Sequence, residues 1–155
     1  MKKLLCSLTI LTVSIIALSY AFAHANYTGR TMMSGTAGCG GCHASVNSTV
    51  QVSISGPDTL SVGKNGTYQV RISGGSGSSV CADIAASAGT LAPADANLKL
   101  SKGELITNGT KRYSGGSYTY SFVLTAPASA QTVTLYATGD EHHVDLQSRK
   151  MLLQK

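Results

Sequence analysis

The chain has 155 residues, and its 12 Lys and Arg exceed its 7 Asp and Glu, which gives a formal net charge of +5. The positive residues are scattered, Trp is absent, and no basic stretch alternates with aromatic residues. This composition argues against a nucleic-acid partner, because a nucleic-acid face needs clustered positive charge. The residues that follow the first 25 suffice for one domain with a modest core.

The first 25 residues have the organisation of a secretory signal peptide. Met1-Lys2-Lys3 is a short basic start, an apolar run follows over residues 4–22, and Ala23-His24-Ala25 is a small-x-small cleavage pattern. Several Ser and Thr interrupt the apolar run, which makes it marginal as a membrane span. We therefore predict cleavage after Ala25, no membrane span in the mature chain, and a periplasmic or extracellular location.

Residues 26–45 form a glycine-rich segment with the most informative motif of the chain. The sequence Cys39-Gly40-Gly41-Cys42-His43 places two thiols where they can form thioether bonds to the vinyl groups of one haem. The adjacent His43 then falls under the iron as its proximal ligand. We therefore predict one covalent haem c, attached through Cys39 and Cys42 and ligated by His43.

Three other kinds of site could use the same residues. A dithiol redox motif needs its first cysteine at a helix N-terminus in a βαβ context, and no such context is visible. A zinc site normally brings a second cysteine pair, and only Cys81 remains. A disulfide across two glycines would be strained and would leave His43 without a role. Cys81 itself is expected as a small buried apolar side chain, with a reactive or intermolecular thiol as the alternative.

The second axial ligand of the iron stays open between several candidates. His142 and His143 rank first as metal ligands, although adjacent residues of a strand point to opposite faces and do not easily bind one iron. An open or water-bound position ranks second. Met32 and Met33 rank third, because they precede the motif by only six or seven residues and the loop would have to fold back sharply.

Residues 46–155 change to a period of two, in which apolar and polar residues alternate. Turn sequences such as Gly56-Pro57-Asp58 separate the short stretches, and nowhere do apolar residues recur at helical spacing over three turns. We predict an all-β domain, an antiparallel immunoglobulin-like β-sandwich of seven or eight strands, preceded by the haem-binding loop. The alternating stretches are 50–54, 60–62, 68–72, 80–86, 98–100, 105–107, 118–124, 132–137 and 144–153.

Two parts of the chain resemble known families. Residues 27–44 look like the glycine-rich entry of exported c-type cytochromes that carry the haem motif ahead of a β-sandwich. Residues 55–70 are similar to the first strands of reelin-like, choice-of-anchor bacterial domains. This resemblance covers the first half of the mature chain well and the rest loosely, and it implies covalent haem at Cys39, Cys42 and His43. The chain departs from the common small cytochrome c, which wraps its haem in helices.

The function expected from these features is electron transfer, not enzyme catalysis. No acid–base or nucleophile constellation accompanies the motif, and an exposed haem edge suits exchange with redox partner proteins better than turnover in a dry pocket. One alternative is a homo-oligomer or filament in which one copy supplies a histidine to the haem of the next. Others are haem-based gas or redox sensing and a plain surface adhesion domain without haem.

Overall fold

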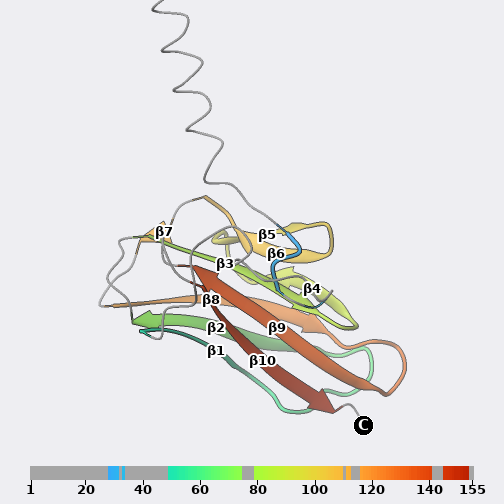
Figure 1. The fold of residues 1–155 in the computed structure, drawn as a ribbon. Helices are drawn as coiled ribbons and strands as arrows, with labels where there is room; N and C mark the ends of the chain where they lie inside the picture. The colour runs from blue at the N-terminus through green and yellow to red at the C-terminus, as the bar shows by residue number, and fades with distance from the viewer. Residues whose placement is uncertain are drawn as a thin grey trace, which may run out of the picture.

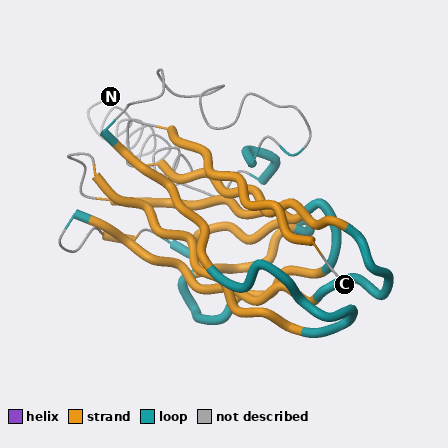
Figure 2. Tube along the Cα trace, turned by 90° about the horizontal axis from the view of Figure 1, so that it is seen from below, coloured by secondary structure: helices purple, strands orange, loops and turns teal. Residues whose placement is uncertain are grey.

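The computed structural model describes residues 28–31, 33, 49–74, 79–109, 111–112, 116–140 and 145–153, the last strand by its backbone alone. The described residues form strands and turns, and Figure 2 shows no helix among them. None of them belongs to a helix long and apolar enough to cross a membrane.

Ten antiparallel strands form two sheets that pack face to face (Figures 1 and 2). One sheet has four strands in the order β1-β2-β8-β4, and the second has the order β10-β9-β3-β6-β5 with β7 paired to β3. The strands are β1 (Val50–Ser55), β2 (Asn65–Gly74), β3 (Ser79–Ala86), β4 (Thr90–Pro93), β5 (Leu98–Ser101), β6 (Glu104–Thr107), β7 (Lys111–Arg112), β8 (Ser117–Thr125), β9 (Thr132–Asp140) and β10 (Asp145–Leu153).

The strand order is that of an immunoglobulin-like sandwich with an insertion. When β5, β6 and β7 are set aside, the other seven strands give the sheets β1-β2-β8-β4 and β10-β9-β3. In chain order these are the A-B-E-D and G-F-C sheets of an immunoglobulin domain. The predicted fold is therefore confirmed, and the inserted strands extend the second sheet beyond the seven-strand scheme.

Two details of the predicted strands are wrong. Residues 60–62 form no strand; Leu60 instead packs over the start of β2, where a Cβ on Gly66 would lie 2.7 Å from Leu60 Cδ2. The short strands β4 and β7 were not expected, because they expose nearly every residue and give no visible alternation. In β4, Leu91 is the one buried residue.

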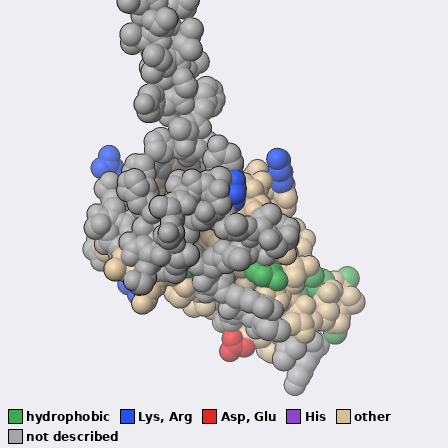
Figure 3. Space-filling view, in the orientation of Figure 1, with side chains coloured by type: hydrophobic (Ala, Val, Ile, Leu, Met, Phe, Trp, Pro, Cys, Tyr) green, Lys and Arg blue, Asp and Glu red, His purple; other side chains and the backbone are tan. Residues whose placement is uncertain are grey.

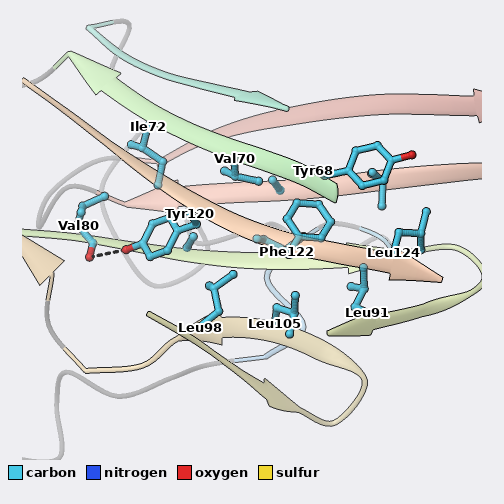
Figure 4. Close-up of a cluster of buried hydrophobic side chains, with 14 of the residues drawn as sticks. Tyr68, Val70, Ile72, Val80, Leu91, Leu98, Leu105, Tyr120, Phe122 and Leu124 are labelled. Atoms are coloured by element: carbon cyan, nitrogen blue, oxygen red, sulfur yellow. Dashed lines mark hydrogen bonds between the residues drawn. The ribbon is translucent and has the colours of Figure 1, made fainter. Parts of the chain in front are cut away.

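The core lies between the sheets and is built from the alternating residues of the four central strands (Figure 4). The rings of Tyr68 and Phe122 stack with centroids 5.6 Å apart. Each of these strands turns every second residue inward, as a half-buried strand requires. The central buried residues are Tyr68, Val70, Ile72, Val80, Ala82, Ile84, Tyr120, Phe122, Leu124, Val133, Leu135 and Ala137.

One end of the sandwich positions the segments of functional interest. We call it the entry end: β1, β3, β8 and β10 begin there and β2 and β9 end there, at the left of Figure 1. Thr49 precedes β1 at this end, and Asp140 closes β9. Gly139 lets the sheets approach closely, since a Cβ there would lie 2.5 Å from Ile72 Cδ1 and 3.0 Å from Val52 Cγ2.

Candidate functional site

The predicted haem residues lie outside the described residues. These are Cys39, Cys42, His43, His142 and His143, together with Met32 and the signal peptide 1–25. What the structure describes is the chain on either side of them. Met33, the remaining ligand candidate, has a side chain that is 43% exposed.

The two segments that carry the predicted haem ligands, one before β1 and one between β9 and β10, both join the sandwich at the entry end. The motif segment joins β1 through Thr49, and His43 is six residues before Thr49. The connection from β9 to β10 joins Asp140 to Asp145, which are Cα partners in the register. His142 is two residues from Asp140 and His143 is two residues from Asp145, so each can reach about 7 Å from its paired neighbour. The six residues from His43 to Thr49 can span at most about 20 Å. Chain length therefore permits both segments to meet at the entry end.

The chain just before the motif is attached to the outer face of the second sheet. The N–H of Gly29 donates to Glu104 Oε2, and the N–H of Arg30 donates to Asp83 Oδ2 at 3.0 Å. The Thr31 hydroxyl lies 3.4 Å from Glu104 Oε1, and Thr31 is only 3% exposed. Figure 1 shows this segment, in blue, beside β6. Two carboxylates thus fix a stretch that ends eight residues before Cys39.

Asp83 reaches this face through the alternation of β3. Val80, Ala82 and Ile84 point into the core, so Cys81 and Asp83 lie on the opposite side of the same strand. Asp83 is nevertheless 5% exposed, because the N-terminal segment lies over it.

Glu104 is placed by the tight turn between β5 and β6. Lys102 and Gly103 have φ values of +50° and +87°, and Ser101 pairs with Glu104 across them. Positive φ at both central residues is the type I′ hairpin, whose twist matches the flanking strands. Because Asp83 pairs with Ile106, Glu104 occupies a diagonal position on the same face, within reach of a long side chain.

Burial and the neighbouring Glu104 shift the pKa of the Asp83 carboxyl. The pKa of Asp83 is raised to about 7, chiefly because its carboxyl is buried, and also through the negative charge of Glu104 and a hydrogen bond with it. The N–H groups of Arg30 and Ile84 act in the opposite direction, because they stabilise the charged carboxylate. Among the described residues, neither carboxylate forms an ion pair with a Lys or Arg side chain.

Two buried side-chain oxygen atoms on this face, one of them from Asp83 itself, have no hydrogen-bond partner among the described residues. They are Asp83 Oδ1 and Thr138 Oγ1. Asp83 and Thr138 are Cα partners in the β3–β9 ladder, so both atoms belong to one face. The described part of the chain holds no group of three or more His, Cys, Asp or Glu arranged around a metal ion.

Sequence reasoning missed this acidic pair and misjudged Cys81. The Cys81 side chain is exposed, not buried, because it lies on the outer side of β3. The available signal for Asp83 was a charged residue between apolar neighbours in a predicted strand. No local signal marks Glu104, whose burial depends on a segment more than 70 residues earlier in the chain.

On the face of the molecule drawn in Figure 3, the described Lys and Arg side chains stand apart from one another. This arrangement agrees with the scattered positive charge of the sequence.

Comparison with known proteins finds solved structures that are similar to this chain but assigns the chain to no family. No family model matches the sequence, and no curated protein matches it. A crystal structure of the CARDB domain of a Pyrococcus furiosus protein, in complex with di-metal ions, is 22% identical over 68% of this chain and 91% of that one, with a TM-score of 0.47. The solution NMR structure of that domain is 17% identical over 68% of this chain and 94% of that one, also with a TM-score of 0.47.

Proposed function

We propose that this protein is an exported monohaem c-type cytochrome that transfers electrons outside the cytoplasm. The observation that carries the proposal is the motif Cys39-Gly40-Gly41-Cys42-His43 behind a secretory signal pattern. Export supports the motif, because the thiols of such proteins are joined to haem outside the cytoplasm in bacteria. When bound, the haem supplies reversible one-electron chemistry at its iron.

Different residues would bind the haem and hold the motif segment on the sandwich. Cys39 and Cys42 would hold the haem through two thioether bonds, and the imidazole of His43 would ligate the iron. Upstream of the motif, Asp83 and Glu104 hold the chain against the second sheet. Downstream, β1 holds it from Val50 onward, through pairing with β2. Both ends of the motif segment are therefore attached to one rigid sandwich.

A second ligand to the iron would best come from His142 or His143. Their connection is short and starts from the paired Asp140 and Asp145 at the entry end, where the motif segment also joins the sandwich. Neutral imidazole is a common iron ligand, and two histidine ligands favour electron transfer over ligand binding because no coordination position stays open. Met33 is a weaker candidate, because it lies on the upstream side and much of its side chain is exposed.

The proposal is tested by the visible absorption spectrum of the exported protein, produced with haem-maturation machinery. We expect sharp reduced bands that do not change on adding carbon monoxide, and the haem should stay with the chain after denaturation. The Cys39→Ser/Cys42→Ser variant should lose the bands, whereas Cys81→Ser should keep them. A wild-type protein without haem bands would exclude the proposal.

The same spectra separate the alternatives. A shift of the reduced bands with carbon monoxide would indicate an open iron position and favour gas sensing. A mixture of His142→Ala and His43→Ala proteins that restores a six-coordinate spectrum would indicate ligation between copies, as in a filament.

A further inference from the structure

The outer face of the second sheet holds two neighbouring carboxyl groups under residues 29–31, the blue segment beside β6 in Figure 1. Asp83 and Glu104 are 5% and 9% exposed, and a hydrogen bond joins their side chains. A hydrogen bond between two carboxyl groups needs a proton, because two ionised carboxylates offer only acceptors. The pair is therefore suited to hold one proton, and with it one negative charge instead of two.

The hydrogen-bond donors around the pair match a single negative charge. The N–H of Gly29 and the hydroxyl of Thr31 contact the carboxyl of Glu104. The N–H of Arg30 donates to Asp83 Oδ2 at 3.0 Å, but Asp83 Oδ1 is buried and has no partner among the described residues. An unsatisfied oxygen costs more on a charged group than on a neutral one. Loss of the shared proton would therefore leave a second buried charge without compensation.

The segment that covers the pair is the part of this face that opens most easily. Residues 29–31 belong to no strand, whereas Asp83 and Glu104 lie in β3 and β6, which pair within the sheet. Segments outside the ladders open locally at a lower free energy than core strands do. Once residues 29–31 lift away, water reaches both carboxylates and solvates the second charge.

We propose that Asp83 and Glu104 share one proton, and that this proton latches residues 29–31 onto the second sheet. When the pair loses the proton to solvent, the two buried carboxylates repel one another and the segment detaches. The latch goes beyond the proposed function and depends on neither the haem nor export. It makes the attachment of the chain upstream of Cys39 respond to pH.

The latch closes at low pH and opens at high pH. The pKa of Asp83 is raised from 3.8 to about 7 in the closed state, and it returns toward about 4 when the carboxyl is solvated. Docking is therefore most favoured below about pH 4, and it weakens by up to about tenfold per pH unit until about pH 7. Other titratable or charged residues occupy register positions of this face or belong to the covering segment. They are Cys81 on β3, Lys99 on β5, Arg112 on β7, Tyr136 and Asp140 on β9, Asp145 and Arg149 on β10, and Arg30.

Limited trypsin digestion at a series of pH values tests the latch on the exported full-length chain. Cleavage after Arg30 needs the segment to open. Cleavage after Lys64, an exposed residue just before β2, is the reference for the enzyme's own pH dependence. Mass spectrometry gives the ratio of the two rates. We expect this ratio to rise at least about tenfold from pH 5 to pH 7 and to level off above about pH 8.

Two amide variants replace the shared proton by a group that stays neutral at every pH. The side-chain amide of Asp83→Asn or of Glu104→Gln can donate to the remaining carboxylate. Each variant should therefore keep the ratio low and independent of pH. Asp58→Asn, which changes an exposed carboxylate, is the matched control and should keep the profile of the unmutated protein.

Three outcomes of the digestion would overturn the proposal. They are a ratio independent of pH in the unmutated protein, an unchanged rise in both amide variants, and a ratio that is high in these variants at every pH. If neither variant folds, the infrared spectrum of the unmutated protein decides. At pH 6, where ordinary carboxyl groups are ionised, one protonated carboxyl should give a C=O band that disappears as the pH rises to 8. The absence of this band would overturn the proposal, whereas the absence of haem bands would leave it untouched.

Discussion

The hydroxyl of Tyr120 in the first sheet donates a hydrogen bond to the carbonyl of Val80 in the second sheet, at 3.1 Å (Figure 4). The hydroxyl of Thr107 lies 3.1 Å from the same Tyr120 oxygen and accepts the N–H of Ala82 at 2.7 Å. The β3–β6 ladder contains only two residue pairs. The hydrogen bonds of the Thr107 side chain therefore extend the contact between β6 and β3 beyond the ladder. A buried polar connection thus crosses an otherwise apolar core.

Tyr120→Phe should destabilise the domain although the ring is retained. The change removes the donor to Val80 and leaves buried oxygens unsatisfied, which costs about 1–3 kcal/mol. Urea unfolding measures the loss. Tyr118→Phe, on the same strand but only partly buried, is the matched control and should cost much less. Equal losses would show that the bond to Val80 contributes nothing specific.

Gly139→Ala should destabilise the entry end by steric conflict. A Cβ at this position would lie 2.5 Å from Ile72 Cδ1, and overpacking of a core costs about 1–3 kcal/mol. Thermal unfolding measures the effect. The double variant Gly139→Ala/Ile72→Val removes the conflicting methyl group and should recover part of the loss. A double variant whose loss equals the sum of the two single losses would contradict the steric explanation.

Stability should depend on pH through the buried carboxyl of Asp83. The pKa of Asp83 is raised from 3.8 to about 7 in the fold. Between these values the unfolded carboxyl has lost its proton and the folded one keeps it, so stability falls as the pH rises from about 4 to about 7. Urea unfolding of the unmutated protein across this range should show the decline, and Asp83→Asn should flatten it. A decline that persists unchanged in Asp83→Asn would contradict the assignment to this residue.

Glu104→Ala should release residues 29–31 from the second sheet. Arg30 is a trypsin site whose neighbours Gly29 and Thr31 contact Glu104, and proteolysis needs a locally opened chain. Limited trypsin digestion followed by mass spectrometry should show faster cleavage after Arg30 in the variant. Cleavage after Lys64, an exposed residue just before β2 in the other sheet, serves as the internal control and should keep its rate in a folded variant. Unchanged cleavage after Arg30 would mean that other contacts hold the segment.

The sandwich was predictable because its central strands obey one simple rule. Tyr118, Tyr120, Phe122 and Leu124 recur at every second position, with the polar Thr119 and Ser121 between the first three, since β8 has one face in the core and one toward solvent. Local sequence carries that pattern completely. It does not carry β4 or β7, whose few residues are defined by pairing with strands distant in the chain.

The burial of Asp83 and Glu104 could not be predicted from local sequence, because it also depends on residues distant in the chain. Alternation correctly places Asp83 on the outer face of its sheet, where a charged residue is normally solvated. Its burial arises from residues 29–31, which lie more than 50 positions earlier. The proposed haem motif, by contrast, can be inferred from sequence, because the chemistry proposed for it depends on spacing within five residues and not on tertiary contacts.

The attachment of residues 29–31 at one end and of Val50 at the other turns the motif segment into a closed loop on its own sandwich. A loop fixed at both ends has already lost much of the entropy that a free tail would lose on ordering. Groups held this way meet at effective concentrations of roughly millimolar. Histidines on other copies at micromolar concentration would compete poorly with His142 or His143 of the same chain. If haem binds as proposed, the two attachments would therefore favour a second ligand from the same chain over one from another copy.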